Sequence, residues 1–116
     1  MTAEPVSDLF AVTTSPEPAV GRVRMAVRGE LDLSTAATLV EAFDQVSATS
    51  PAEVELDASG LTFCDSSGIG AFLTGAKRCA DDGIALRIVG LRPSVCRAFE
   101  LCGVTDMFDL EPEQDS

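Results

Sequence analysis

The fold is decided by one stretch of the chain, from Val54 to Ala80, which reads VELDASGLTFCDSSGIGAFLTGAKRCA. Glu53 to Asp57 alternates polar and apolar side chains with the period of a half-buried strand. Ala58 to Gly60 breaks this alternation and predicts a turn. Apolar residues then follow at helical spacing and predict one buried stripe on a helix of about three turns: Ile69, Phe72, Leu73, Ala76 and Ala80.

A short polar segment, Asp65-Ser66-Ser67-Gly68, separates this strand from this helix. It places a carboxylate and two hydroxyls at the N-terminal end of the helix. Such oxygens commonly cap a helix by accepting hydrogen bonds from its first N–H groups. They can also form a functional site. The pattern alone leaves both interpretations open.

The composition predicts a single folded domain. A chain of 116 residues, 46% of them hydrophobic, can bury a modest core, so disorder of its body is not expected. No apolar run approaches the roughly 18 residues of a membrane-spanning helix. The N-terminus also lacks the basic end and apolar middle of a signal peptide. We therefore expect a cytoplasmic protein without a membrane association.

The charge is strongly acidic, with 8 basic and 19 acidic residues and a net charge of -11. Nucleic acids and anionic membranes bind proteins through cations, so a polyanion is repelled by both. The charge disfavours direct nucleic-acid binding and favours a protein partner with basic patches. The alternative interpretation is that acidity serves solubility alone.

The sequence offers no constellation for catalysis, for a metal or for a cofactor. The chain has no histidine, which excludes a Ser-His-Asp triad. Gly68 and Gly70 begin a dinucleotide-binding fingerprint, but Leu73 stands where its third glycine belongs, and Ala76 stands where a phosphate loop needs lysine. We therefore expect a protein that is not an enzyme.

The four cysteines form no CxxC pair and, without histidine, do not predict a zinc site. Most stand among apolar residues, where a reduced cysteine behaves as a small hydrophobic side chain. One of them adjoins the polar segment and raises the hypothesis of thiol control. These residues are Cys64, Cys79, Cys96 and Cys102, and Cys64 is the one beside the polar segment.

The N-terminal part predicts two strands and a helix. One strand begins at Leu9 to Val12, and Thr13 to Val20 is expected to be a loop or hairpin connection. Arg22 to Arg28 alternates cleanly and predicts a strand with arginines on its outer face. Ser34 is a plausible N-cap for the next helix. The buried side of that helix is expected to contain Ala36, Leu39, Val40, Phe43 and Val46.

The C-terminal part predicts two further strands separated by a helix. Gly83 is expected to end the preceding helix in the left-handed conformation. Ile84 to Val89 predicts a mostly buried strand closed by Gly90, and Pro93 suits the first turn of a helix that stops at Gly103. The inward residues of that helix should be Val95, Phe99 and Cys102, and Met107 to Leu110 predicts a last short strand.

The alternation of strands and helices predicts an α/β domain with a mixed β-sheet of about four to five strands covered by helices. We expect a flexible N-terminus at 1–8, the domain at 9–110 and an acidic tail at 111–116. Sites in open α/β sheets gather at the carboxyl ends of strands. Glu30 to Asp32 and Asp65 to Ser67 each follow a strand and precede a helix, so they should emerge at the same edge.

Two segments carry a resemblance to a known family. Glu30-Leu31-Asp32 after a strand, and Leu61 to Gly70 with its Asp-Ser-Ser-Gly core, resemble the STAS domain of bacterial anti-anti-sigma factors. The similarity runs from about Val23 to Leu110 and implies a single STAS-type domain. Cys64 stands where the family usually has an apolar residue, which does not disturb the match.

The resemblance implies an anti-sigma factor antagonist that regulates transcription by partner switching, as in bacterial stress responses. In this family the unphosphorylated form binds an anti-sigma factor that is also a serine kinase and so releases a sigma factor. The kinase phosphorylates a serine, here Ser66 with Ser67 as the second choice, and a serine phosphatase reverses the modification. The implied partner-binding residues are Glu30, Asp32, Asp65, Ser66, Ser67 and Gly68.

The family also contains STAS modules that sense ligands or support larger assemblies, with the serine never phosphorylated. This is the alternative function that the resemblance leaves open. The sequence does not indicate the oligomeric state.

Overall fold

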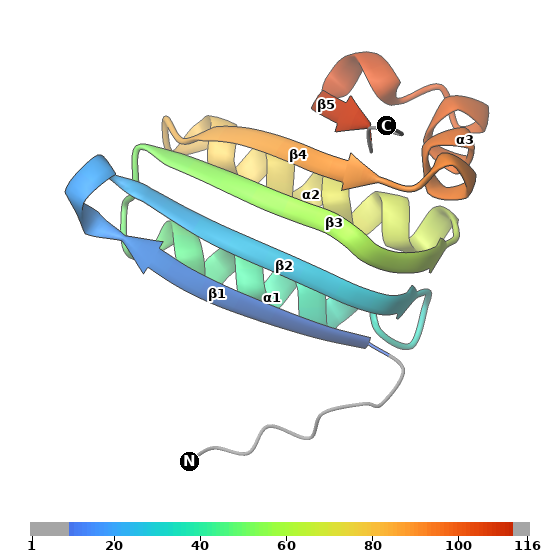
Figure 1. Cartoon of the computed structure of the whole chain (residues 1–116), viewed down its shortest axis with the longest axis horizontal. Coiled ribbons are helices and arrows are strands. Elements are labelled where there is room, and N and C mark those ends of the chain that lie inside the picture. Colours follow the sequence, from blue (N-terminus) through green and yellow to red (C-terminus); the bar gives the residue numbers. More distant parts are fainter. Residues whose placement is uncertain (1–9, 113–116) are drawn as a thin grey trace.

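The computed structural model describes residues 10–112, which form a five-stranded sheet with the strand order β1-β2-β3-β4-β5 (Figure 1). β1 is antiparallel to β2, and the other neighbouring strands are parallel. The α/β class and the mixed sheet are confirmed. The strands are β1 (Phe10–Glu17), β2 (Arg22–Leu31), β3 (Glu53–Cys64), β4 (Ala85–Leu91) and β5 (Asp109–Pro112). The helices are α1 (Ala36–Ser47), α2 (Ser66–Asp81) and α3 (Pro93–Leu101).

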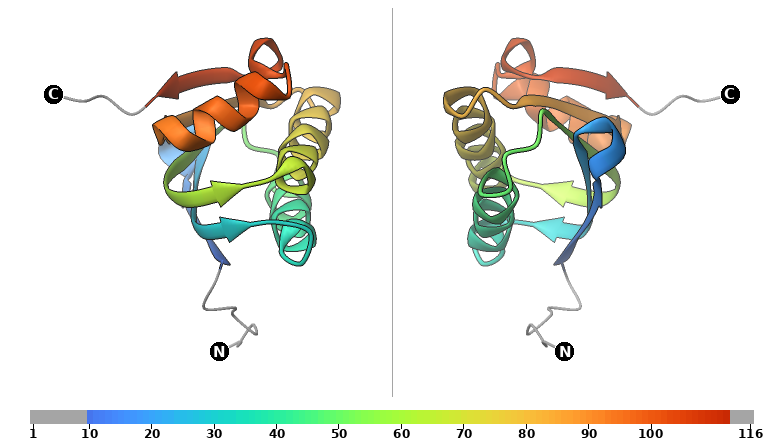
Figure 2. Two further views of the ribbon diagram at one scale, coloured as in Figure 1. Left: turned by 90° about the vertical axis from the view of Figure 1, so that its right-hand side faces the viewer. Right: turned by 90° about the vertical axis from the view of Figure 1, so that its left-hand side faces the viewer.

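Two helices form a layer on one face of the sheet. Figure 2 shows α1 and α2 side by side on that face, with α3 near β5. A Cβ at Gly75 in α2 would overlap the Phe43 ring of α1, so glycine is what allows this close contact. Phe99 of α3 packs edge-on against Phe72 of α2 with 5.4 Å between ring centroids. The core is therefore continuous from α1 to α3. No helix in the described residues is both long and apolar enough to span a membrane.

The turn predicted at Ala58 to Gly60 is wrong, because β3 continues through it to Cys64. The pairing with β2 shifts register twice along this part of the ladder, so β3 contains bulges where a turn was expected. A Cβ at Gly60 would lie 2.8 Å from the Cβ of Arg28 on the neighbouring strand. Glycine here permits a close approach between the two strands. In the sequence, a glycine needed for such a contact looks the same as a glycine in a turn.

Two further strand predictions need correction. β1 does not end at Val12 but extends to Glu17 through Pro16, which an edge strand tolerates because one side of its backbone needs no partner. β4 contains Gly90, whose φ of +76° accompanies a register shift against β5. The last strand, β5, starts two residues later than predicted and includes Glu111, which was assigned to the tail. The predicted flexible segment 1–8 and residues 113–116 lie outside the described residues.

The helices follow their predicted positions, but some buried faces differ. In α2, Ile69 and Phe72 are buried as predicted, whereas Ala80 is exposed, and Leu73 and Ala76 are only partly buried. The buried face instead continues through Ala71, Gly75 and Cys79. The small residues there let α2 approach its neighbours closely, so they mark the core side although they are not the most hydrophobic.

The helix ends confirm some predictions and correct others. Gly83 and Gly103 are left-handed, with φ of +70° and +71°, as expected of helix stops. The N-cap position of α1 is Thr35 and not Ser34. Cys102 is exposed at the C-cap of α3 and does not face inward.

Candidate partner-binding site

The two segments predicted to share an edge lie together in the structure. The carboxyl ends of β2 and β3 are adjacent where the chain turns into α1 and α2 (Figure 1). Leu31 pairs with Cys64, and the backbone N–H of Asp65 donates to the Leu31 carbonyl at 3.2 Å. This hydrogen bond joins the β2–α1 junction to the β3–α2 junction.

Asp65 is the N-cap of α2. Its backbone is extended, with φ -100° and ψ -170°, and its Oδ1 accepts a hydrogen bond from the Gly68 backbone N–H at 3.0 Å. Its carbonyl accepts the first helical bond, from the Ile69 N–H at 3.0 Å. Aspartate is among the best residues for this position. The capping role therefore falls to the carboxylate and leaves both serine hydroxyls available.

Ser66 and Ser67 are the first two residues of α2. Ser66 is exposed and Ser67 is half-buried. Within residues 10–112, neither hydroxyl has a hydrogen-bond partner, and neither do the two backbone N–H groups. Unpaired N–H groups and the helix dipole make a helix N-terminus favourable for a negative charge. An exposed hydroxyl therefore stands at the end of the helix that best tolerates an added anion.

Gly68 is buried, so any contribution to partner binding is indirect. A Cβ at this position would lie 2.7 Å from the Cys64 Sγ and 2.9 Å from the Leu31 carbonyl oxygen. Only glycine lets the first turn of α2 sit against the ends of β2 and β3. Gly68 thereby positions Ser66 and Ser67.

The β2–α1 junction is organised by Asp32. Its Oδ1 accepts hydrogen bonds from the Ser34 hydroxyl at 2.8 Å, the Ser34 N–H at 3.0 Å and the Thr35 hydroxyl at 3.2 Å. The hydrogen bond from the Ser34 hydroxyl, supported by the others, lowers the pKa of the Asp32 carboxyl. These bonds hold the loop and keep Asp32 ionised.

Thr35 is a buried polar residue that the sequence analysis missed. Its Oγ1 accepts from the Asp32 N–H at 2.9 Å and lies 3.1 Å from the Glu30 carbonyl oxygen. The adjacent hydroxyls of Ser34 and Thr35 before a helix were the available signal, but Ser34 was preferred as the cap. Thr35 in fact ties the end of β2 to the start of α1.

Two exposed apolar side chains at this edge were also missed. Leu33, in the β2–α1 loop, is 80% exposed, and Phe63, near the end of β3, is 47% exposed. Phe63 pairs with Glu30 on β2, and Glu30 is exposed as well. The sequence signal for Leu33 was an apolar residue between the polar Asp32 and Ser34. The sequence contained no signal that Phe63 is exposed, because the bulges in β3 change the face of the sheet to which the later residues of that strand point.

Cys64 is an unsuitable thiol for redox control. It is buried, and burial together with the nearby negative charge of Asp65 raises its pKa to about 12. The thiolate is the reactive form, and it is scarce at neutral pH when the pKa is so high. The geometry argues for a structural role.

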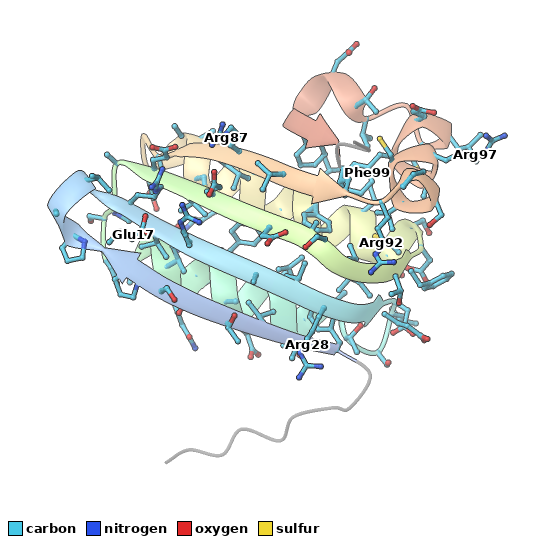
Figure 3. The ribbon with its side chains drawn as sticks, in the orientation of Figure 1. Glu17, Arg28, Arg87, Arg92, Arg97 and Phe99 are labelled. Atoms are coloured by element: carbon cyan, nitrogen blue, oxygen red, sulfur yellow. The ribbon has the colours of Figure 1, made fainter. Side chains whose placement is uncertain are left out.

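The ion pairs lie away from this edge, on the sheet and on α1 and α2. Glu17 binds Arg22 at 2.7 Å and Arg24 at 3.1 Å, and Arg87 binds Glu55. Figure 3 shows Glu17 and Arg87 toward the end of the sheet opposite Arg92. In the described part of the chain, the site acids Glu30, Asp32 and Asp65 form no ion pair. No group of three or more metal-ligating side chains occurs there either.

A family model described as "Mlab, STAS domain" matches residues 17–111, which is most of the chain. The chain belongs to the STAS domain family. The match spans both junctions of the site and extends through most of β5, so the resemblance recognised from Glu30–Asp32 and Leu61–Gly70 is confirmed.

Relatives of this STAS chain include anti-sigma factor antagonists. It is 27% identical over 85 residues to the anti-sigma-B factor antagonist of Listeria monocytogenes, covering 73% of this chain and 75% of that protein. It is 25% identical over 114 residues to the anti-sigma-F factor antagonist RsfA of Mycobacterium tuberculosis, covering 97% and 88%. The crystal structure of an anti-sigma factor antagonist from Mycobacterium paratuberculosis has the same fold, with a TM-score of 0.78, 24% identity and coverage of 95% and 90%.

Proposed function

We propose that this STAS chain is an anti-sigma factor antagonist, a binding protein and not an enzyme, that works by partner switching. Its unphosphorylated form binds an anti-sigma factor that is a serine kinase, and a sigma factor is released. Phosphorylation of Ser66 ends the contact, and a serine phosphatase restores it. The observation that carries the proposal is that Asp65 caps α2 and leaves the exposed Ser66 hydroxyl unbonded.

Ser66 is preferred over Ser67 because it is more accessible. A kinase must reach the acceptor hydroxyl, and Ser66 is exposed whereas Ser67 is half-buried. A phosphate on Ser66 would lie beside the unpaired N–H groups at the start of α2, where an anion is favoured. The modified protein is therefore expected to remain folded.

The added charge accounts for the loss of binding. A phosphate contributes a charge of about -1.5 to -2. In the contact it would add bulk beside Ser66, and its charge would have to lose water there, next to the acids Glu30, Asp32 and Asp65, which form no ion pair in the described residues. Weakening binding a hundredfold requires about 2.7 kcal/mol, and misplaced interface charge can cost several kcal/mol. One modification is sufficient.

The acceptor is tested by incubating the protein with ATP and the anti-sigma serine kinase of the same organism. We expect intact-mass measurement to find one phosphoryl group on wild type and on Ser67→Ala, and none on Ser66→Ala. The Ser67→Ala protein is the matched control, since it loses the neighbouring hydroxyl. Phosphorylation of Ser66→Ala, with none on Ser67→Ala, would assign the switch to Ser67 instead.

The alternative, a STAS module for ligand sensing or scaffold assembly that is never phosphorylated, predicts a different result. Protein isolated from its own cells would then carry no phosphoryl group under any growth condition. It would also bind no anti-sigma factor in purified form. Either a phosphorylated fraction or a stable complex with an anti-sigma factor rejects this alternative.

A further inference from the structure

Two large apolar side chains are exposed beside the proposed phosphorylation site. In the described part of the chain, the exposed large hydrophobic residues are Val20, Leu33, Phe63 and Leu101. Leu33 and Phe63 both lie at the edge formed by the ends of β2 and β3. Scattered exposed apolar residues are ordinary, but a pair at a polar site calls for a reason.

Both residues are close to the hydrogen bond that joins the two junctions. Leu33 is two residues after Leu31, whose carbonyl accepts the Asp65 N–H at 3.2 Å. Phe63 is two residues before Asp65 and pairs with Glu30 across the β2–β3 ladder. A partner that covers Ser66 therefore has both apolar side chains within reach.

The loop that carries Leu33 is held on both sides of that residue. On one side the Asp32 N–H donates to the Thr35 hydroxyl at 2.9 Å, and on the other the Ser34 N–H donates to the Asp32 Oδ1 at 3.0 Å. These bonds fix the backbone but leave the Leu33 side chain 80% exposed. A backbone that is already fixed loses less conformational entropy when a partner binds. The Leu33 side chain buries little apolar surface when the free protein folds, so it can still bury that surface against a partner.

We propose that Leu33 and Phe63 are the apolar anchors by which this protein binds its anti-sigma factor, an inference that rests on the proposed function. Buried apolar anchors at the centre of an interface commonly supply most of the binding energy, within a polar rim. The acids Glu30 and Asp32 adjoin these anchors. The complementary surface is therefore an apolar pocket bordered by lysine or arginine side chains.

The test is calorimetric titration of variants against the anti-sigma serine kinase that phosphorylates Ser66. Leu33→Ser and Phe63→Ser should each bind at least tenfold more weakly than wild type. The matched control is Val20→Ser, because Val20 is 63% exposed and lies before the start of β2, at the end of the sheet opposite the site. This control should bind within twofold of wild type.

Two further measurements separate binding from folding and from the proposed function. Phe63→Leu keeps an apolar side chain and should recover most of the affinity lost in Phe63→Ser, and thermal unfolding should show that Leu33→Ser is as stable as wild type. If wild type binds and Leu33→Ser binds as tightly as Val20→Ser, the anchor proposal is overturned while the antagonist function stands. If unmodified wild type does not bind the kinase at all, the proposed function fails, and this inference fails with it.

Discussion

The two junctions at the edge of the sheet use the same residue types for different purposes. Each has an aspartate after a strand and two hydroxyl residues near the start of a helix. At the β2–α1 junction the carboxylate binds both hydroxyls, whereas at the β3–α2 junction it binds a backbone N–H and leaves both hydroxyls free. The residues compared are Asp32, Ser34 and Thr35 with Asp65, Ser66 and Ser67. Hydrogen-bond partners, and not composition, distinguish a structural loop from a candidate switch.

The difference follows from the distance between each aspartate and its helix. Asp65 immediately precedes α2 and occupies the N-cap position, from which a carboxylate reaches the N–H three residues ahead. Asp32 lies three residues before Thr35, the N-cap of α1, so its carboxylate reaches the loop instead. A shift of three residues thus decides which hydroxyls remain accessible.

The largest effect on stability is expected from Gly68→Ala, which would disrupt the β3–α2 junction. The new Cβ would lie 2.7 Å from the Cys64 Sγ and 2.9 Å from the Leu31 carbonyl oxygen, and the backbone oxygen cannot easily move. Overpacking of this kind lowers the free energy of unfolding by about 1–3 kcal/mol. Urea denaturation measures the change.

Gly70→Ala is the matched control in the same helix. A Cβ at Gly70 would meet nothing within 4 Å, and replacing glycine by alanine within a helix is favourable by up to about 1 kcal/mol. We therefore expect opposite signs for the two alanine variants. Equal destabilisation would show that Gly68 is not needed for the contact between α2 and the strand ends.

An intermediate effect is expected from Asp65→Ala, which removes the N-cap of α2. The Gly68 N–H would lose its partner, and loss of such a cap costs about 1 kcal/mol. Asp65→Asn should cost less, because the amide oxygen can still accept this hydrogen bond. Denaturant unfolding of both variants gives the comparison, and an equal cost for alanine and asparagine would argue against the cap.

The smallest effect is the pH dependence of Asp32. Hydrogen bonds from Ser34 and Thr35 lower its folded-state pKa below the usual 3.8, so the ionised form is favoured by folding. This contribution to stability is present above pH 3.8 and is lost as pH falls through the folded-state pKa. An NMR titration should place the Asp32 midpoint below 3.8, and the stability advantage of wild type over Asp32→Ala should narrow in acid. A midpoint at or above 3.8 would contradict the loop geometry.

The sequence predicted the features that depend on periodicity and strand order. The alternation of Arg22 to Arg28 identified β2, and the rule that sites collect at strand ends brought Asp32 and Asp65 to one edge. The sequence-based prediction was wrong at Ala58 to Gly60. The glycine at position 60 is required by its close contact with Arg28 on the neighbouring strand β2, which local sequence patterns do not reveal. In the segment Asp-Ser-Ser-Gly, the aspartate or either serine could be the N-cap of the helix. The extended backbone angles of Asp65 in the structure identify it as the N-cap.

The most direct measurement compares the affinity of the anti-sigma serine kinase for three forms of the protein. These are the unmodified chain, the chain with phosphoserine installed at Ser66 and the chain with phosphoserine installed at Ser67. We expect phosphoserine at Ser66 to weaken binding at least a hundredfold, or about 2.7 kcal/mol, while the helical content of the protein is unchanged. Equal affinity of the unmodified and Ser66-phosphorylated proteins would contradict the account.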